Sequence, residues 1–420
     1  MIRKYISNTF EYDSIRGGIL MTNTVQLTEE KVDMKHWLAV AERIGQLAEA
    51  ESREADQNAR FSPKIAEAIV EGGINKLMRP EEYGGTFIGV EPFTKIVRKV
   101  ASHSIAAAWL TNFFAIHDIW PGYLPKKGRE EVLGSGALIA DVFAPIGRLE
   151  KDEKGYRLYG QWNFASGVLW SEYIGLGAMA DFGNGPEYVM PVLKTSDPNL
   201  TLIENWDTLG MRATGSNGVS VDGAYIPEHL ILKGKDIFDL GKPAGGNYDQ
   251  EDPIYRMPFM QMFLAAFPAT SLGAMDRLIE IFQERTEKRV RVFNRGKNEK
   301  NGSGSQRALA EMKIQLRQVE GLMDRYIEVL EQFQEEGKTV ASEEERMELF
   351  AIRSQAAKMV AEMALKVILT LGGTSIFKGD PVELFIRDVI SFASHPTQLW
   401  EDAMSSYGST QFGGPGHPTW

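Results

Sequence analysis

The sequence predicts a mainly α-helical protein with a central β-barrel, and three observations along the chain support this prediction. Apolar residues recur at helical spacing in residues 25–135 and again in residues 246–404. Between these parts, residues 136–245 consist of short strand-like runs separated by turns. We expect an N-terminal helical domain, a β-barrel domain and a C-terminal four-helix bundle, with a disordered segment or extension at 1–24 and a tail at 405–420.

The composition excludes several functions. The 420 residues carry a net charge of −11, which opposes nucleic-acid binding because phosphate neutralisation needs a basic face. The chain has no cysteine, which excludes disulfides, thiolate metal sites and thiol nucleophiles. Its six histidines show none of the paired spacings of metal ligands, so we expect no metal site.

The sequence lacks the patterns of membrane insertion and secretion. No apolar run approaches the roughly 20 residues that span a bilayer. Residues 1–20 carry charges and no apolar central block, so they do not form a secretory signal. We expect a cytoplasmic protein without membrane partners, in which residues 1–20 are a disordered extension or a misassigned start before Met21.

In the N-terminal part, Trp37 and Ile44 belong to one helical repeat, and Ser62-Pro63 is typical of a helix start. A further helix is expected from Phe93 to His117. Within it, Trp109 and His117 are eight residues apart, about 80° around a helix, so both can border one pocket. The residues alone favour a core role for Trp109 and a hydrogen-bonded structural role for His117.

In the middle part, strands are expected near residues 156–162, 173–179, 187–193 and 217–226. The turn Phe164–Gly167 contains Ser166, whose hydroxyl can donate or accept a hydrogen bond. The same serine is equally suited to closing a strand turn. Both interpretations stay open at this point.

The C-terminal bundle is predicted from four helical patterns, at 257–291, 307–334, 343–371 and from Pro381 onward. The basic stretch 285–297, at the end of the first, is either a solvated helix end or a phosphate-binding cluster.

The last helix follows the turn Gly372-Gly373-Thr374 and carries Arg387 and Asp388 in an otherwise apolar pattern. Burying charge is costly unless the charge is paired, so we expect these two side chains in a fixed hydrogen-bond network. His395 precedes a proline, which excludes the α region for the residue before it. His395 is therefore expected at a helix end or break, where its imidazole can point into a cavity.

Together these features resemble the acyl-CoA dehydrogenase fold, and within it the oxygenase components of two-component flavin-dependent monooxygenases. The chain looks similar to 4-hydroxyphenylacetate 3-hydroxylase oxygenase and related aromatic or thiophene monooxygenases from about Val25 onward. The motifs are the Gly-Gly-Thr turn with Arg387 to His395, the Phe164–Gly167 turn and the loop Leu209–Ser216. Where acyl-CoA dehydrogenases commonly carry a catalytic Glu-Gly-Thr, this chain has His-Pro-Thr, so it lacks that base.

The resemblance implies a role for each candidate residue. His395 would tune protonation on the peroxide side of the flavin, His117 would orient or deprotonate the substrate, and Ser166 would bond the flavin N5 edge. Trp109 would lie beside the flavin.

The resemblance also implies further cofactor contacts. Arg291 of an Arg-x-Phe motif would meet the flavin phosphate, and Gly373 and Thr374 would bind the cofactor at the glycine turn.

The implied reaction uses reduced FMN, with FAD possible, and O₂. A flavin C4a-hydroperoxide would transfer one oxygen atom to an aromatic or heteroaromatic substrate. No Gly-x-Gly-x-x-Gly segment follows a strand, so a separate NAD(P)H-dependent flavin reductase is expected to supply the flavin. Members of this family are typically homotetramers.

One departure leaves the substrate open. Phenol-hydroxylating relatives usually carry serines before a position matching Ala144-Pro145, where this chain has Asp141-Val142-Phe143. Either Asp141 contacts the substrate in their place, or the substrate is less polar at that end.

Two other functions stay open. In an FAD-dependent acyl-CoA dehydrogenase, Glu280 or Glu284 would have to supply the missing base. A helical scaffold that merely kept the fold would bind no flavin.

Overall fold

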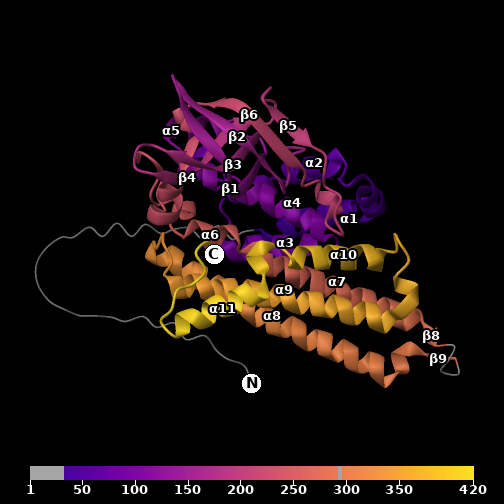
Figure 1. Cartoon of the computed structure of the whole chain (residues 1–420). Coiled ribbons are helices and arrows are strands. Elements are labelled where there is room, and N and C mark those ends of the chain that lie inside the picture. The colour runs from indigo at the N-terminus through magenta and orange to yellow at the C-terminus, as the bar shows by residue number, and fades with distance from the viewer. Residues whose placement is uncertain (1–32, 292–295) are drawn as a thin grey trace, which may run out of the picture. The chain divides into compact units, whose positions relative to one another are not determined.

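The computed structural model describes residues 33–291 and 296–420, so the predicted extension at 1–24 lies outside the described residues. A β-sheet lies on one side of this part and the C-terminal helices lie on the other (Figure 1). Helix α4 (Ile105–Ile116) runs between them and contacts strand β1, helix α7 and helix α10. All twelve residues of α4 are buried, so this helix forms the centre of the fold.

The N-terminal part is helical, as predicted, but the expected helix from Phe93 to His117 is divided in two. Ser104 has an extended backbone, with φ −151° and ψ 120°, and its hydroxyl accepts the Ala107 N–H at 3.2 Å. This side-chain cap starts α4, whereas α3 has already ended at Ala101. The helices of this part are α1 (Met34–Asn58), α2 (Pro63–Glu71), α3 (Val90–Ala101), α4 and α5 (Lys126–Val132).

The middle part forms a seven-stranded sheet in the order β5-β6-β2-β1-β3-β4-β7. Strands β1 and β3 are parallel, and the other neighbouring pairs are antiparallel. The strands are β1 (Ile139–Asp152), β2 (Gly155–Trp162), β3 (Tyr173–Asp181), β4 (Pro186–Lys194), β5 (Leu200–Ile203), β6 (Gly218–Ile226) and β7 (Ile231–Lys233).

The prediction of a closed barrel is wrong, because this sheet is open. Closure needs hydrogen bonds between the two edge strands. Here the edges are β5 and β7, which have four and three residues and pair only with β6 and β4 within the described chain. Such short edges leave few unpaired backbone groups, so the sheet is stable without closing.

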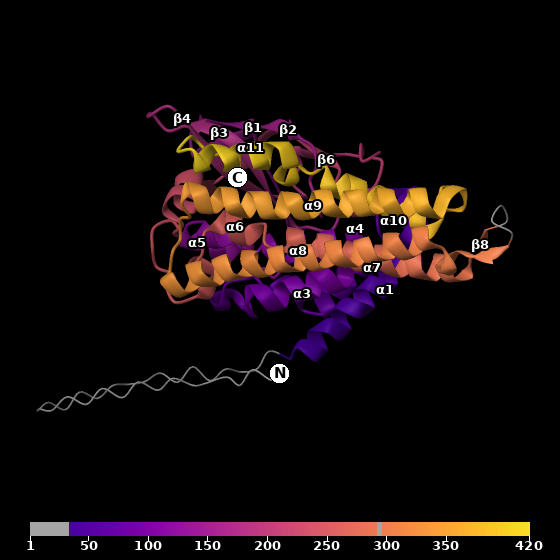
Figure 2. The ribbon, with the colours of Figure 1, turned by 90° about the horizontal axis from the view of Figure 1, so that it is seen from below.

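The C-terminal helices pack around α9, and Figure 2 shows α7, α8 and α9 running side by side. A short hairpin of β8 (Val290–Arg291) and β9 (Lys297–Asn298) follows α7. The helices are α6 (Phe259–Phe263), α7 (Ala266–Lys288), α8 (Ser303–Glu336), α9 (Glu343–Leu371), α10 (Pro381–Ala393) and α11 (Trp400–Gln411).

The single helix predicted over 257–291 is broken after Phe263. Pro268 lies in the first turn of α7, where the missing N–H leaves no bond unmade, but it could not continue a helix from Leu264. At the other end of the bundle, the segment predicted as a tail begins inside α11. Ala403 of α11 and Trp420 at the end of the chain pack on Met347 and Phe350 of α9. Periodicity does not reveal such a tertiary contact.

The predicted Arg387–Asp388 network is confirmed, and it fastens α10 to the loop before β6. Arg387 bonds both oxygens of Asp56, the Leu209 carbonyl at 2.6 Å and Glu383. Asp388 accepts the Met211 N–H at 2.6 Å. Gly210 is needed between them, because a Cβ there would lie 2.2 Å from the Arg387 carbonyl oxygen.

Across the described ranges, no helix has both the length and the apolar composition to cross a bilayer.

Candidate active site

A row of aromatic side chains on α4 forms the centre of the candidate site. Trp109, Phe113 and His117 follow one another at four-residue spacing, so they lie on one face of the helix. The ring centroids of Trp109 and Phe113 are 4.5 Å apart, and those of Phe113 and His117 are 4.8 Å apart. Phe263 and Phe267, near the start of the bundle, pack against the same row. We call these five rings the aromatic row.

Ser166 lies at the Trp109 end of the aromatic row. The Trp109 indole N–H donates to the Ser166 hydroxyl at 3.0 Å. That hydroxyl also contacts the Ser216 hydroxyl at 2.9 Å, which in turn lies 2.8 Å from Thr214 Oγ1. Three hydroxyls therefore form a chain that leads away from the indole.

The turn that carries Ser166 has little freedom to move. Phe164 and Gly167 both have positive φ, +66° and +80°. A Cβ at Gly167 would lie 2.6 Å from the Phe114 ring, so a larger residue cannot replace this glycine without displacing α4. The Ser166 hydroxyl is thus held at a fixed place beside Trp109.

His395 reaches the same end from the other side. It lies at the break between α10 and the short turn 396–398, with ψ 138°, which confirms the predicted helix break. Its ring centroid is 5.1 Å from that of Trp109 and 5.6 Å from that of Phe267. The structure therefore brings together Trp109, Ser166 and His395 from three parts of the chain.

The tautomer of His395 follows from its contacts. The Thr397 N–H donates to Nδ1 at 3.4 Å, and the Thr397 hydroxyl lies 2.8 Å from the same atom. Because an N–H can only donate, Nδ1 is an acceptor and the neutral ring carries its proton on Nε2. Burial, together with the nearby positive charge of Arg353, lowers the pKa of His395 to about 4, so the ring is neutral at pH 7.

Arg353 is a component of this site that the sequence analysis missed. It is fully buried on α9, and its Nε donates to the Thr397 carbonyl at 2.7 Å. Its two terminal nitrogens have no hydrogen-bond partner within the described ranges, and the guanidinium lies over the Phe350 ring at 4.6 Å. An arginine within the buried stretch of α9 was the available signal.

At the opposite end of the aromatic row, His117 is fully buried. Its Nδ1–H donates to the Ile139 carbonyl at 2.7 Å, so in the neutral ring Nε2 is an acceptor. That Nε2 lies 3.2 Å from Asp141 Oδ2, although without the geometry of a hydrogen bond. Burial lowers the pKa of His117 to about 3, only partly opposed by the bond to Ile139.

Asp141 completes this end of the row. Its Oδ2 accepts the Trp120 indole N–H at 3.0 Å. Burial raises the pKa of Asp141 to about 8, against the opposing effect of that bond. The carboxyl is therefore mainly protonated at pH 7 and lies beside a neutral imidazole.

Two of the predicted cofactor-binding residues, Gly373 and Thr374, lie elsewhere. Gly373 and Thr374 are exposed in the turn after α9, and no hydrogen bond found in the described part of the chain joins them to the aromatic row. The Arg291 side chain lies outside the described residues. Nearby Arg289 donates to the Thr370 carbonyl at 3.3 Å and pairs with Glu299 at 3.0 Å, so it holds the turn.

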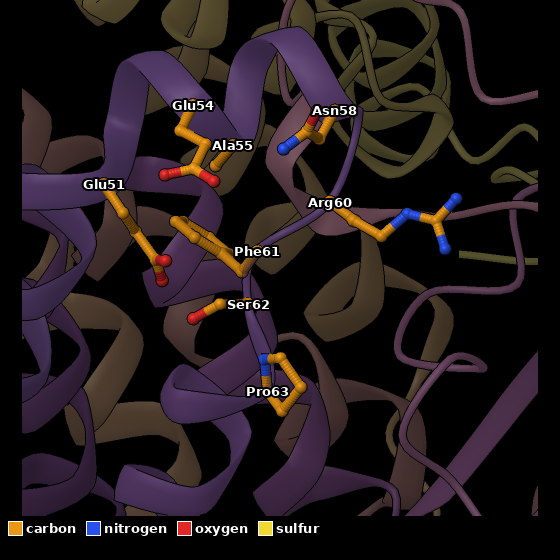
Figure 3. A pocket seen from close by; sticks show the side chains of 8 residues that line it. All are labelled: Glu51, Glu54, Ala55, Asn58, Arg60, Phe61, Ser62 and Pro63. Carbon is orange, nitrogen blue, oxygen red and sulfur yellow. The ribbon is translucent and has the colours of Figure 1, made fainter.

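Two surface hollows lie away from the aromatic row. One of about 440 Å³, shown in Figure 3, lies where α1 meets α2 and is lined partly by Glu51, Glu54 and Phe61. The other, of about 580 Å³, surrounds Arg387 and Arg212. Neither contains a candidate site residue. In the described part of the chain, no three side chains of histidine, aspartate or glutamate are grouped as metal ligands would be.

The aromatic row differs from both hollows because predicted site residues line it. Trp109 and Ser166 each keep 8% of their surface exposed and Phe113 keeps 7%, whereas Ala106, Ala107 and Ala108 of the same helix keep none. Solvent therefore reaches this face of α4. It offers apolar ring faces, a hydroxyl that donates or accepts, and the Nε2–H of His395, which suit an aromatic heterocycle with polar edges.

Comparison with known proteins agrees with this fold. Residues 265–398 match the family described as acyl-CoA dehydrogenase, C-terminal domain. The structure of XiaF from Streptomyces sp., in complex with FADH2 and glycerol, superposes with a TM-score of 0.82 at 20% identity and covers 90% of this chain and 96% of its own. The predicted acyl-CoA dehydrogenase-like fold is confirmed.

Relatives found by sequence are oxygenase components. The chain is 26% identical over 376 residues to the flavin-dependent monooxygenase, oxygenase subunit HsaA, of Rhodococcus jostii (strain RHA1), covering 87% of this chain and 95% of that protein. It is 25% identical over 346 residues to the p-hydroxyphenylacetate 3-hydroxylase, oxygenase component, of Acinetobacter baumannii, covering 81% and 80%. The resemblance stated from the motifs is confirmed.

Proposed function

We propose that this protein is the oxygenase component of a two-component flavin-dependent monooxygenase that inserts one oxygen atom from O₂ into an aromatic substrate. The observation that carries this proposal is the meeting of Trp109, Ser166 and His395 beside the aromatic row. Similarity to oxygenase components over more than four-fifths of the chain supports the same reaction class.

The acyl-CoA dehydrogenase alternative is not favoured. Its reaction needs a carboxylate that abstracts a proton beside the flavin. Glu280 and Glu284 are both exposed on α7, and Glu280 pairs with Arg277. The imidazole of His395 lies where the resemblance would place that base.

In the proposed site, the chain's own groups would bind and shield a reduced flavin. When bound, the flavin would supply the activation of O₂. Ser166 would hold the N5 edge of the ring, because its hydroxyl can donate or accept as protonation changes. His395 would offer its Nε2–H to the flavin, and the aromatic row would exclude water. Both FMN and FAD remain compatible with this arrangement, and reduced FMN is our first choice.

The proposal includes two kinds of partner. A separate NAD(P)H-dependent reductase would deliver the reduced flavin, as expected for an oxygenase component. A second copy of the chain would cover the exposed apolar side chains of Leu369, Ile376 and Phe377, which flank the glycine turn and are at least 63% exposed. In a homotetramer, Gly373, Thr374 and Arg291 would then contribute to a flavin site shared between subunits.

Rapid mixing tests the proposed function. The protein, loaded anaerobically with FMNH₂ or with FADH₂, is mixed with oxygenated buffer while flavin absorbance is followed. A reoxidation with at least two phases, slower overall than that of the free flavin, is expected. Reoxidation identical to that of free flavin for both cofactors would contradict the proposal, as would stable binding of oxidised FAD with acyl-CoA-dependent reduction.

The matched variants Ser166→Ala and Ser171→Ala test whether the Ser166 hydroxyl is responsible for the slowed flavin reoxidation. Each removes one buried serine hydroxyl, but Ser171 only donates to the Gly167 carbonyl, at 2.9 Å. Ser166→Ala is expected to accelerate reoxidation about tenfold, since one preorganised hydrogen bond contributes roughly 1.4 kcal/mol or more in such sites. Ser171→Ala is expected to leave it unchanged.

A further inference from the structure

Asp141 is a buried acid that no cation accompanies. Of the other buried carboxyls, Asp118 pairs with Arg79 at 2.7 Å, Glu299 pairs with Arg289 at 3.0 Å, and Asp252 accepts two backbone N–H groups. Asp141 instead contacts a tryptophan N–H and lies near a histidine that burial keeps neutral. An unpaired carboxylate in such a place is strongly disfavoured, so the protonated form fits these surroundings best.

The contacts determine which oxygen of Asp141 is left for a ligand. Oδ2 accepts the Trp120 N–H and faces Nε2 of His117, which needs a donor because its Nδ1 carries the ring proton. A proton on Oδ2 satisfies that acceptor after a small rotation of the carboxyl. Oδ1 then acts as a carbonyl oxygen, and it accepts no hydrogen bond within the described ranges.

The free oxygen lies where solvent still reaches. Asp141 retains 7% exposure, whereas His117 and Trp120 retain none. Phe113 and Phe263 pack directly on the ring of His117, so this carboxyl is at the end of the aromatic row opposite His395. A planar substrate lying along the row would meet Oδ1 with its edge.

We infer that Asp141 determines substrate specificity, by accepting at Oδ1 a hydrogen bond from an aromatic substrate that carries an O–H or N–H group. This inference rests on the proposed function and narrows its substrate class. Hydroxylated rings and rings with an N–H are selected, and thiophenes and aryl ethers are not. A buried acceptor left unpaired by the wrong ligand provides the discrimination.

His117 acts in this scheme as a positioning residue. Both of its nitrogens face protein atoms, Ile139 O and Asp141 Oδ2, so neither is directed at a substrate. Its acceptor Nε2 keeps the carboxyl proton on Oδ2 and leaves Oδ1 for the ligand. This assignment differs from the direct substrate contact expected for His117 from the sequence.

Two pairs of probes that are close in shape test the inference: indole against benzothiophene, and phenol against anisole. Binding to the anaerobic reduced-flavin complex is measured by the fluorescence of its tryptophans and by calorimetry, so no turnover is needed. We expect indole and phenol to bind about tenfold to 100-fold more tightly than their partners, as one unpaired buried polar group is worth roughly 1–3 kcal/mol.

Variants of Asp141 identify the residue responsible. Asp141→Leu has similar volume and no acceptor, so it is expected to abolish both preferences. Asp141→Asn replaces Asp141→Leu as the test if the leucine variant does not fold. If the amide oxygen of the asparagine accepts the Trp120 N–H, its amide N–H faces the ligand. The N–H of indole then has no acceptor, so the preference for indole is expected to disappear. Val142→Ala, a neighbouring change in size alone, is expected to keep the preferences.

The outcomes separate this inference from the proposed function. Equal binding of the paired probes by the natural protein overturns the role of Asp141, as does either preference that survives Asp141→Leu or a preference for indole that survives Asp141→Asn. Binding of none of the four probes also overturns it, while slowed flavin reoxidation would still support the oxygenase assignment. If neither reduced flavin binds, the proposed function fails first.

Discussion

The two histidines at the ends of the aromatic row are held in opposite tautomers. His395 accepts at Nδ1 from the backbone N–H of Thr397 and keeps its proton on Nε2. His117 donates from Nδ1 to the backbone carbonyl of Ile139 and leaves Nε2 as an acceptor. The same side chain thus presents a donor at one end and an acceptor at the other, because the backbone group that it meets differs.

Their charged neighbours differ as well. A guanidinium, Arg353, lies near His395, and a carboxyl, Asp141, lies near His117. Both imidazoles are nevertheless neutral, because burial is the largest influence on each pKa. We conclude that desolvation sets the charge at both ends, while single backbone contacts set the direction of hydrogen bonding.

The largest effect is expected from removing the His395 donor, at the end of the aromatic row where we propose that the flavin binds. His395→Ala should lower product formed per O₂ consumed about 100-fold and release H₂O₂ in its place, within the usual range for a positioned acid–base group. Product and H₂O₂ are quantified together after one turnover. His36→Ala, a change on the exposed start of α1, is the control. Unchanged coupling in His395→Ala would remove this residue from the mechanism.

Asp141 should make the largest contribution to the loss of folding stability as the pH rises. The pKa of Asp141 is raised from 3.8 to about 8, so folded protein keeps a proton that the unfolded chain has released. Its contribution is complete below about pH 4 and is lost as pH rises to about 8. As the pH rises across this window, the free energy of unfolding of Asp141→Asn should therefore increase relative to that of the natural protein, by up to about 1.4 kcal/mol per pH unit.

Denaturant titrations between pH 5 and pH 9 measure this difference. Burial also raises the pKa of Asp118 and of Asp388, each to about 7, so the Asp141→Asn variant still loses some stability as the pH rises, but less than the natural protein does. A slope that is the same in both proteins would show that Asp141 is ionised in the folded state.

A smaller effect is expected from Arg353→Met at the other end. Arg353 bonds the Thr397 carbonyl, but no carboxylate of the described residues pairs with it. Replacing this buried guanidinium with an apolar side chain should therefore leave stability unchanged or raise it by about 1–2 kcal/mol. The pKa of His395 should rise from about 4 toward its ordinary value, since one cause of its lowering is removed. Imidazole titration by NMR checks the pKa, and Arg346→Met, near the start of α9, is the control. A fall in stability above 3 kcal/mol, on the order of a broken buried pair, would contradict the absence of a carboxylate partner.

The smallest effect is expected from Thr397→Val. The change removes the hydroxyl at 2.8 Å from His395 Nδ1 and keeps the backbone N–H at 3.4 Å. Stability should fall by about 1 kcal/mol, and a minor population with the proton on Nδ1 should appear. Nitrogen chemical shifts of the imidazole report the tautomer. Thr397→Ser keeps the hydroxyl and should behave like the natural protein. An unchanged spectrum in Thr397→Val would show that the backbone N–H alone determines the tautomer.

Part of the site was predictable because its signals are local. The proline after His395 predicts a break in the helix, and the four-residue spacing of Trp109, Phe113 and His117 predicts one helical face. The contact between Trp109 and Ser166 was not predictable from spacing, since 57 residues separate them. It followed only from the resemblance. Arg353 and the Asp141–His117 proximity had no comparable motif.

The sequence by itself determined the helices, most of the strands and the flavin-oxygenase resemblance, because periodicity, caps and motifs are properties of neighbouring residues. Tertiary structure alone decided that the sheet stays open and that α11 joins the bundle. It also decided the tautomers and protonation of the two histidines and of Asp141. These depend on desolvation and on contacts between distant segments, and no short stretch of sequence contains that information.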